Sequence, residues 1–306
     1  MGEDMLTNLI LLIFGFFVLI KGADFFIEGA SGIAMNLGIS KMLVGFTIIA
    51  FGTSAPELGV SIKAITSNNG EILFGNVIGS NIINILLILG ITPLIKEIRI
   101  NNSTLKKELP LIVIITILFG LLLLDRSFTR LDSLFVLGIF MVFLYQIISK
   151  DASSSSEDLS IIKSTIFTIV GLIGVILGSH TVVNSAEVIS ELLGVSERII
   201  SLTVIALGTS LPELVTSISA VKKEEYELVI GNILGSNIFN IGIVVALPIL
   251  IFGKVSNIGI NYIDIITMIS AVIILFISSI NDKKVTKKEG LLFLIIFIIY
   301  YSYVLS

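Results

Sequence analysis

Two glutamates, Glu57 and Glu213, are the residues of this sequence best placed to do chemistry, because each lies in a strongly apolar stretch. The first belongs to the run GTSAPEL at residues 52–58, and the second belongs to GTSLPEL at residues 208–214. An ionisable side chain at membrane depth is costly and usually marks a functional site. Two of them, in two copies of one motif, predict a binding site built from two halves.

The motif around each glutamate supplies further oxygen atoms. Proline removes a backbone donor and, with the nearby glycine, should break the helix at this point. Freed carbonyl groups at membrane depth are tolerated only where they line a polar cavity. We therefore expect open carbonyls at Ala50 and Ala206, close to the two carboxylates. The same turns carry the hydroxyl groups of Thr53, Ser54, Thr209 and Ser210.

A second motif is also present twice and extends this set of donors. Residues 75–85 read GNVIGSNIINI and residues 231–241 read GNILGSNIFNI, which repeats the offset of the first motif. Its glycines are four apart, a spacing that suits close helix packing. A serine and an asparagine in each copy share one helical face, namely Ser80 with Asn84 and Ser236 with Asn240. Asn76 and Asn81 face elsewhere, and we expect them to hydrogen-bond the broken backbone of the neighbouring span.

Together these groups predict a cation site made only of hard oxygen donors with two negative charges. Such ligation suits Na⁺, Ca²⁺ or Mg²⁺, and an irregular mixture of hydroxyls, carbonyls and amides fits Ca²⁺ best. The chain has no cysteine and one histidine, which excludes thiolate sites and multi-histidine zinc or iron sites. Either motif alone is compatible with simple helix packing. Duplication of both, with a buried glutamate in each copy, favours a functional site.

The composition indicates the elements that position these groups. The chain is 55% hydrophobic and only 14% charged, with a mean hydropathy of +1.08, whereas soluble domains carry about 25% charged residues. We predict an all-α integral membrane protein with ten transmembrane helices of about 20 apolar residues each. The acidic start MGEDM argues against a cleaved signal peptide. The predicted spans are 5–27, 42–65, 71–95, 108–125, 131–149, 161–182, 198–221, 227–252, 261–280 and 287–305.

Ten spans divide into two halves of five, and the repeated motifs occupy the second and third span of each half. An odd number of spans per half means that the repeats are inverted. We predict a first five-helix repeat at 1–149, a short linker at 150–160, and a second, inverted five-helix repeat at 161–306. The lysine and arginine bias of the loops favours both termini outside and a cytoplasmic linker, in a multi-pass protein of the cell membrane.

The paired motifs resemble the two α-repeats of the calcium/cation antiporter superfamily, the group of sodium/calcium exchangers and their prokaryotic relatives. The resemblance implies a transporter rather than an enzyme, which exchanges Ca²⁺ for Na⁺ by alternating access and needs no cofactor. It implies that Glu57 and Glu213 are the central ligands. It also implies that the flanking sodium sites are lined by Thr53, Ser54, Ser80, Thr209, Ser210, Ser236 and the carbonyls of Ala50 and Ala206, with Asn84 and Asn240 closing the site.

Two positions depart from the family pattern and leave alternatives open. Many relatives carry an aspartate where this chain has Asn240, so potassium coupling and proton sensitivity are open here. His180 stands where an acid is frequent, and we interpret it as a polar residue at a span end, with a proton-linked role as the alternative. A Ca²⁺/H⁺ antiporter is the closest rival, although Ser80 and Ser236 favour sodium. An ion channel is a further rival, and it would need no counter-ion.

The expected partners follow from this interpretation. They are the transported ions Ca²⁺ and Na⁺ and the membrane lipid, with no nucleic acid. A monomer suffices for the mechanism.

Overall fold

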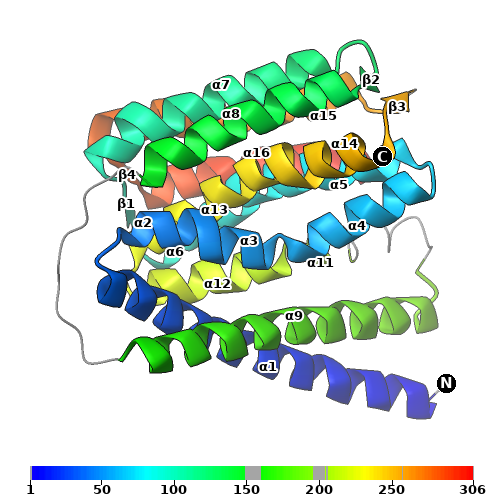
Figure 1. The fold of residues 1–306 in the computed structure, drawn as a ribbon. Coiled ribbons are helices and arrows are strands. Elements are labelled where there is room, and N and C mark those ends of the chain that lie inside the picture. Colours follow the sequence, from blue (N-terminus) through cyan, green and yellow to red (C-terminus); the bar gives the residue numbers. More distant parts are fainter. Residues whose placement is uncertain (1, 149–159, 196–203, 205, 257, 306) are drawn as a thin grey trace.

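The computed structural model describes residues 2–148, 160–195, 204, 206–256 and 258–305, and consists almost entirely of helices (Figure 1). The elements of the first half are α1 (Gly2–Leu37), α2 (Lys41–Val44), the π-helical turn η1 (Gly45–Ile49), α3 (Ala50–Thr53), α4 (Ala55–Thr66), α5 (Gly70–Ile82), the π-helical turn η2 (Ile83–Ile88), α6 (Leu89–Ile95), β1 (Ile98–Arg99), the π-helical turn η3 (Thr104–Glu108), α7 (Leu109–Leu122), β2 (Ser127–Phe128) and α8 (Arg130–Ile148).

The second half repeats much of this order. Its described elements are α9 (Ile161–Leu192), α11 (Ala206–Gly208), α12 (Leu211–Lys222), α13 (Tyr226–Phe239), the π-helical turn η5 (Asn240–Val245), α14 (Ala246–Phe252), β3 (Val255–Ser256), α15 (Tyr262–Asp282), β4 (Lys284–Val285) and α16 (Lys287–Leu305). The predicted linker at 150–160 lies outside the described residues except for Ser160. The division into two repeats therefore stays a prediction.

The helices agree with the hydropathy of the sequence. Within the described ranges, seven helices are long and apolar enough to cross a membrane, and an eighth candidate is a pair of helices, Lys41–Thr53 and Ala55–Thr66, bent by 48°. These eight coincide with eight of the predicted spans. Predicted span 108–125 contains the shorter helix α7, and predicted span 198–221 begins outside the described residues. The fold is thus an all-helical membrane type, and the count of ten stays a prediction.

Helices α1 and α9 form an antiparallel pair along one face of the bundle (Figure 1). Glycines bring their backbones together: a Cβ on Gly22 would lie 2.6 Å from the Val175 nitrogen, and one on Gly178 would lie 2.5 Å from the Leu19 nitrogen. Small residues permit this close approach between membrane helices. The long pair can therefore pack as one unit against the remaining helices.

The helices that carry the repeated motifs occupy the centre of the bundle, and α7, α8 and α15 lie on the face away from α1 and α9 (Figure 1). Helix α13 is buried along nearly its whole length. Gly231 and Gly235 make this possible, because a Cβ on either would lie 2.8 Å from the backbone of η1. The equivalent surface at Gly75 and Gly79 meets nothing within 4 Å among the described residues.

Loops from distant parts of the sequence gather at two opposite ends of the bundle. At one end β1 pairs with β4, and at the other end β2 pairs with β3, in the same region as both chain termini (Figure 1). The β1–β4 end also holds the ion pair of Lys96 with Glu224 at 2.5 Å. The hydrogen bond that Lys96 donates to Glu224 holds the pKa of the Glu224 carboxyl below its usual value. Among the described residues, the predicted inside loop that holds β1 and the one that holds β4 thus share one end, and the predicted outside loops that hold β2 and β3 share the other.

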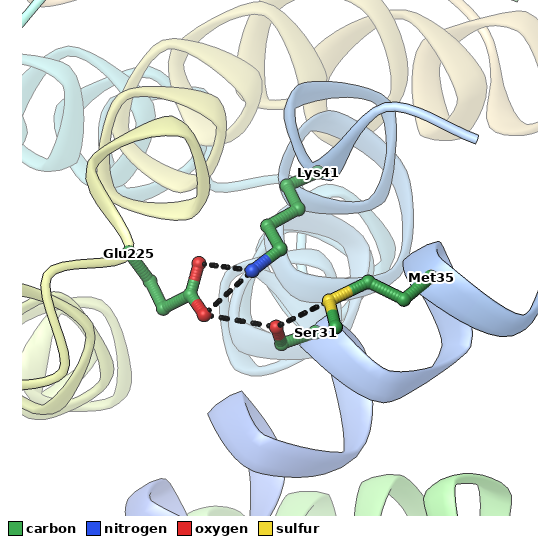
Figure 2. A network of polar contacts seen from close by, with 4 residues as sticks. All are labelled: Ser31, Met35, Lys41 and Glu225. Carbon is green, nitrogen blue, oxygen red and sulfur yellow. Dashed lines mark hydrogen bonds and ion pairs between the residues drawn. The ribbon is translucent and has the colours of Figure 1, made fainter. Parts of the chain in front are cut away.

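A polar network near this end ties α1 to the motif helices of the bundle. Figure 2 shows the Glu225 carboxylate between Lys41 and Ser31. Both Glu225 oxygens lie 2.8 Å from Lys41 Nζ, and Ser31 Oγ donates to Glu225 Oε1 at 2.9 Å. The three residues come from the turn before α13, from the start of α2 and from α1. The network therefore connects α1 and the adjacent α2 to a turn that lies 184 residues beyond Lys41 in the sequence.

Candidate functional site

Both glutamates lie in the first turn of a helix that starts at a break. Ser54 (φ −85°, ψ 7°) ends α3, and α4 begins with Pro56 in its first turn. Ser210 (φ −90°, ψ 4°) precedes α12 in the same way. Proline suits this position because it has no N–H to donate. The predicted helix break is confirmed, and each carboxylate sits at the positive end of a helix dipole, which favours negative charge.

The prediction of an open carbonyl at Ala50 is wrong in this structure. The Ala50 carbonyl accepts a hydrogen bond from Ser54 N at 3.0 Å, because the helical pattern continues up to the break. Because Pro56 has no N–H, the carbonyl four residues back, that of Gly52, loses its helical donor instead. The Ala50 oxygen also accepts from the Thr53 hydroxyl at 3.4 Å. Ala206 is the first residue of α11, the equivalent helix of the second repeat.

The two carboxylates are enclosed, and each is solvated by hydroxyl groups from both repeats. Glu57 and Glu213 are each 1% exposed. Ser54 Oγ donates to Glu213 Oε1 at 3.1 Å, and Ser80 Oγ donates to Glu57 Oε1 at 3.5 Å. The Thr209 hydroxyl also interacts with Glu57. Thr53 and Ser236 also lie near the Glu213 carboxylate. Five of the six sequence-predicted hydroxyl groups therefore surround the acids, and the sixth, that of Ser210, belongs to the residue that precedes the helix of Glu213.

Several buried oxygen atoms of this cluster lack a hydrogen-bond partner among the described residues. These atoms are Glu57 Oε2, Glu213 Oε2, Ser210 Oγ, Ser236 Oγ, Asn84 Oδ1 and Asn240 Oδ1. Within the same part of the chain, neither glutamate forms an ion pair with a lysine or arginine. A buried charge without a partner is strongly unfavourable. The cluster has the oxygen chemistry and the negative charge to hold hard cations.

Amides of the second motif hold the broken segments in place. Asn76 Nδ2 donates to the Glu57 carbonyl at 3.2 Å, and Asn232 Nδ2 donates to the Glu213 carbonyl at 3.4 Å. This confirms the expected contact of Asn76 with the broken span. Asn81 differs from the expectation, because its amide donates to the Asn237 carbonyl in the other repeat at 3.3 Å. The amides thus fix both the helix starts and the contact between the motif helices.

None of the described π-helical turns was predicted from the sequence, and two of them carry asparagines of the second motif. These two are η2, in which Asn84 is the second residue, and η5, which begins at Asn240. Turn η5 packs against α4 and η2 packs against α12, so each of these turns lies beside the glutamate-bearing helix of the other repeat. Such turns are frequent at functional sites. The motif asparagines were the only sequence signal for their position.

A cavity of about 420 Å³ adjoins the cluster between α4, α9 and α11. Pro56 and Thr209 line it, and Thr209 also contacts the Glu57 carboxylate. His180 and Asn184 line it as well, and both side chains are exposed and within hydrogen-bonding distance of each other. The cavity therefore brings exposed polar residues of α9 together with residues of both GTSxPEL motifs.

Enclosed carboxylates between apolar helices are typical of membrane proteins that translocate ions. The comparisons with known proteins agree with this class. A profile of the sodium/calcium exchanger protein family matches residues 7–149 and 163–306. The chain is 37% identical to CaxA of Alkalimonas amylolytica, a candidate antiporter, over 97% of this chain and 98% of that protein. It is 35% identical to the inner membrane protein YrbG of Escherichia coli K12 over 81% of each chain.

The fold agrees as well. The structure of the sodium-calcium exchanger NCX_Mj soaked with 10 mM Na⁺ matches with a TM-score of 0.88 at 29% identity, over 97% of this chain and 99% of that chain. This chain therefore belongs to the sodium/calcium exchanger protein family. It is a multi-pass membrane protein of a family of cation antiporters.

Proposed function

We propose that this protein exchanges Ca²⁺ for Na⁺ across the membrane by alternating access, with both ions bound at the cluster around Glu57 and Glu213. The observation that carries the proposal is the set of buried, unpaired oxygens around two enclosed carboxylates. Two ionised carboxylates neutralise one Ca²⁺, and several Na⁺ ions can replace it. The solved structures of NCX_Mj soaked with Na⁺, with Ca²⁺ or with Sr²⁺ support this choice of ions.

The proposed ligands are the residues that the sequence predicted. Glu57 and Glu213 bind Ca²⁺ centrally. The flanking sodium ligands are Thr53, Ser54, Ser80, Thr209, Ser210 and Ser236 with the carbonyls of Ala50 and Ala206, and the amide oxygens of Asn84 and Asn240 close the site. Exchange of three Na⁺ for one Ca²⁺ would move one net charge per cycle, worth about 2.3 kcal/mol per 100 mV of membrane potential.

The proposed motion uses ten spans arranged as two inverted repeats. Support comes from the element boundaries, because α4 and α12 have equal length and begin at equivalent positions of the two motifs. The antiparallel pair α1 and α9 would slide or rock against the motif helices and open the site to either face. In the proposed orientation both termini are outside, and the end that contains β1 and β4 is cytoplasmic.

The first experiment is ⁴⁵Ca²⁺ uptake into proteoliposomes loaded with Na⁺. Matched vesicles carry K⁺, and a third set has an imposed pH gradient without Na⁺. Uptake only from the Na⁺-loaded vesicles is expected. Uptake driven by the pH gradient alone would replace the proposal with Ca²⁺/H⁺ antiport. Uptake with neither counter-ion would indicate a channel and contradict alternating access.

A further inference from the structure

Four buried asparagines, two from each repeat, form a closed set of hydrogen bonds beside the candidate ion site. Asn81 Nδ2 donates to the Asn237 carbonyl and Asn237 Nδ2 donates to the Asn81 carbonyl, both at 3.3 Å. Asn240 Nδ2 donates to Asn81 Oδ1 at 3.0 Å, and Asn84 Nδ2 donates to Asn237 Oδ1 at 2.9 Å. All four side chains are 1% exposed. We refer to these residues as the asparagine quartet.

The hydrogen bonds fix the direction of every amide in the quartet. A backbone carbonyl only accepts, so Asn81 must turn its Nδ2 toward the Asn237 carbonyl. The Oδ1 of Asn81 then only accepts, and Asn240 must present its Nδ2 to it. The Oδ1 of Asn240 consequently points away from Asn81. The same argument, started from the Asn81 carbonyl, fixes Asn237 and then Asn84.

The two amide oxygens that result are buried and available. Asn84 Oδ1 and Asn240 Oδ1 have no hydrogen-bond partner among the described residues. An unpaired buried acceptor is costly in a folded protein. Asn84 belongs to η2, which packs against α12, and Asn240 belongs to η5, which packs against α4. Helices α4 and α12 carry the glutamates in their first turns. A cation beside the carboxylates supplies the missing partner for both oxygens.

We propose that Asn81 and Asn237 are positioning residues, which aim the amide oxygens of Asn240 and Asn84 at the transported cation across the boundary between the two repeats. The proposal rests on the proposed function and names two residues outside the predicted ligand set. Each repeat thereby orients the closing ligand of the other. Loss of Asn81 releases the Asn240 amide to rotate, so that it can present N–H groups to the cation. Loss of a partner that orients a metal ligand costs about 10–100-fold in affinity.

The test is a pair of double-mutant cycles, with the affinity for ⁴⁵Ca²⁺ measured by equilibrium binding to the purified full-length protein in detergent. Asn81→Ala and Asn240→Ala should each weaken Ca²⁺ binding about tenfold or more. Because Asn81 acts through Asn240, the double variant should bind no more weakly than Asn240→Ala alone. Asn81→Ala combined with Asn84→Ala is the control, because Asn81 does not act through Asn84. In this double variant the two losses of Ca²⁺ affinity should multiply.

The second double-mutant cycle combines Asn237→Ala with Asn84→Ala. Here too the double variant should bind Ca²⁺ no more weakly than Asn84→Ala alone. If Asn81→Ala does not fold, Asn81→Ser replaces it, since a serine is too short to reach the Asn240 amide and should show the same coupling. If the losses of Ca²⁺ affinity multiply in the pairs Asn81 with Asn240 and Asn237 with Asn84, while the wild type still binds Ca²⁺, the positioning role is overturned. A wild type that binds no Ca²⁺ would overturn the proposed function and this inference together.

Discussion

The hydroxyl groups nearest to the two glutamates come from both repeats. Ser54 of the first repeat donates to Glu213, and Thr209 of the second repeat interacts with Glu57. Either acid therefore needs both repeats in place to be solvated. A cation bound there, as we propose, would meet two carboxylates whose hydroxyl partners keep them polar inside an apolar bundle.

Neutralising either glutamate should abolish divalent cation transport. Glu57→Gln or Glu213→Gln keeps the size of the side chain but removes one of the two negative charges that balance Ca²⁺. We expect Ca²⁺ uptake into Na⁺-loaded proteoliposomes to fall by at least about 100-fold, because removal of a charge that pairs with a buried ion costs about 3–5 kcal/mol. The exposed Glu191→Gln on α9 is the matched control and should transport normally. Near-normal uptake by both variants would show that ions bind elsewhere.

Asn240→Asp should make transport depend on pH. In the wild type, Asn240 Nδ2 donates to Asn81 Oδ1. An ionised aspartate at position 240 could not donate to Asn81 Oδ1, and the two oxygen atoms would repel each other. A protonated aspartic acid has an O–H group that can donate and restore the contact. The third carboxylate also binds protons in competition with cations. We expect uptake by this variant to fall from pH 8 to pH 6 by about tenfold more than wild-type uptake, since protons compete with the cations for the added carboxylate. An unchanged profile would place position 240 outside the ion path.

The residue types of the candidate site were predictable from the sequence, but the contacts between them were not. Oxygen-bearing side chains in apolar stretches stand out, so Glu57, Ser80 and Asn84 were found by type and spacing alone. The donation from Ser54 to Glu213 depends on how two distant helices meet, which no local pattern encodes. The open carbonyl expected at Ala50 was wrong because the helix continues to Ser54 before it breaks.

At the scale of elements, the glycines of α1 and α9 set how closely the two helices approach. Gly22→Ala would place a Cβ 2.6 Å from the backbone nitrogen of Val175. Forced overpacking costs about 1–3 kcal/mol, which exceeds the helix-propensity gain of about 0.5–1 kcal/mol for this change. We expect a lower thermal unfolding midpoint in detergent. The matched control is Gly138→Ala on α8, where nothing described lies within 4 Å, and it should be neutral or stabilising.

The network of Ser31, Lys41 and Glu225 should hold the end of α1 against the bundle. Its ion pair is partly exposed, at 28% for Lys41 and 19% for Glu225, so it contributes about 0.2–1 kcal/mol. In Glu225→Gln we expect amide hydrogen exchange across residues 28–41 to become up to about fivefold faster. Glu227→Gln removes a nearby acid that bonds Asn101 instead, and exchange in the same segment should not change. Equal exchange in both variants would mean that the network does not restrain α1.

Hydropathy predicted most helices of the fold because each long apolar stretch has to satisfy its backbone internally in lipid. It did not predict the π-helical turns at Asn84 and Asn240, since packing between helices decides where one extra residue is accommodated. The 48° bend before α4 was predictable from Pro56 and Gly52. The close approach of α1 and α9 was not predicted, because which two spans pack together depends on the tertiary fold.

At the scale of the whole molecule, the two ends of the bundle should face opposite sides of the membrane. Lys254 lies exposed beside β3 at one end, and Lys106 lies exposed near β1 at the other. The chain has no cysteine, so Lys254→Cys and Lys106→Cys each introduce a single reactive thiol. The lysine and arginine bias predicts that Lys254→Cys reacts with a membrane-impermeant maleimide in intact cells. Lys106→Cys should react only after permeabilisation. The reverse pattern would invert the orientation, and labelling of both thiols in intact cells would contradict the placement of the two ends on opposite sides.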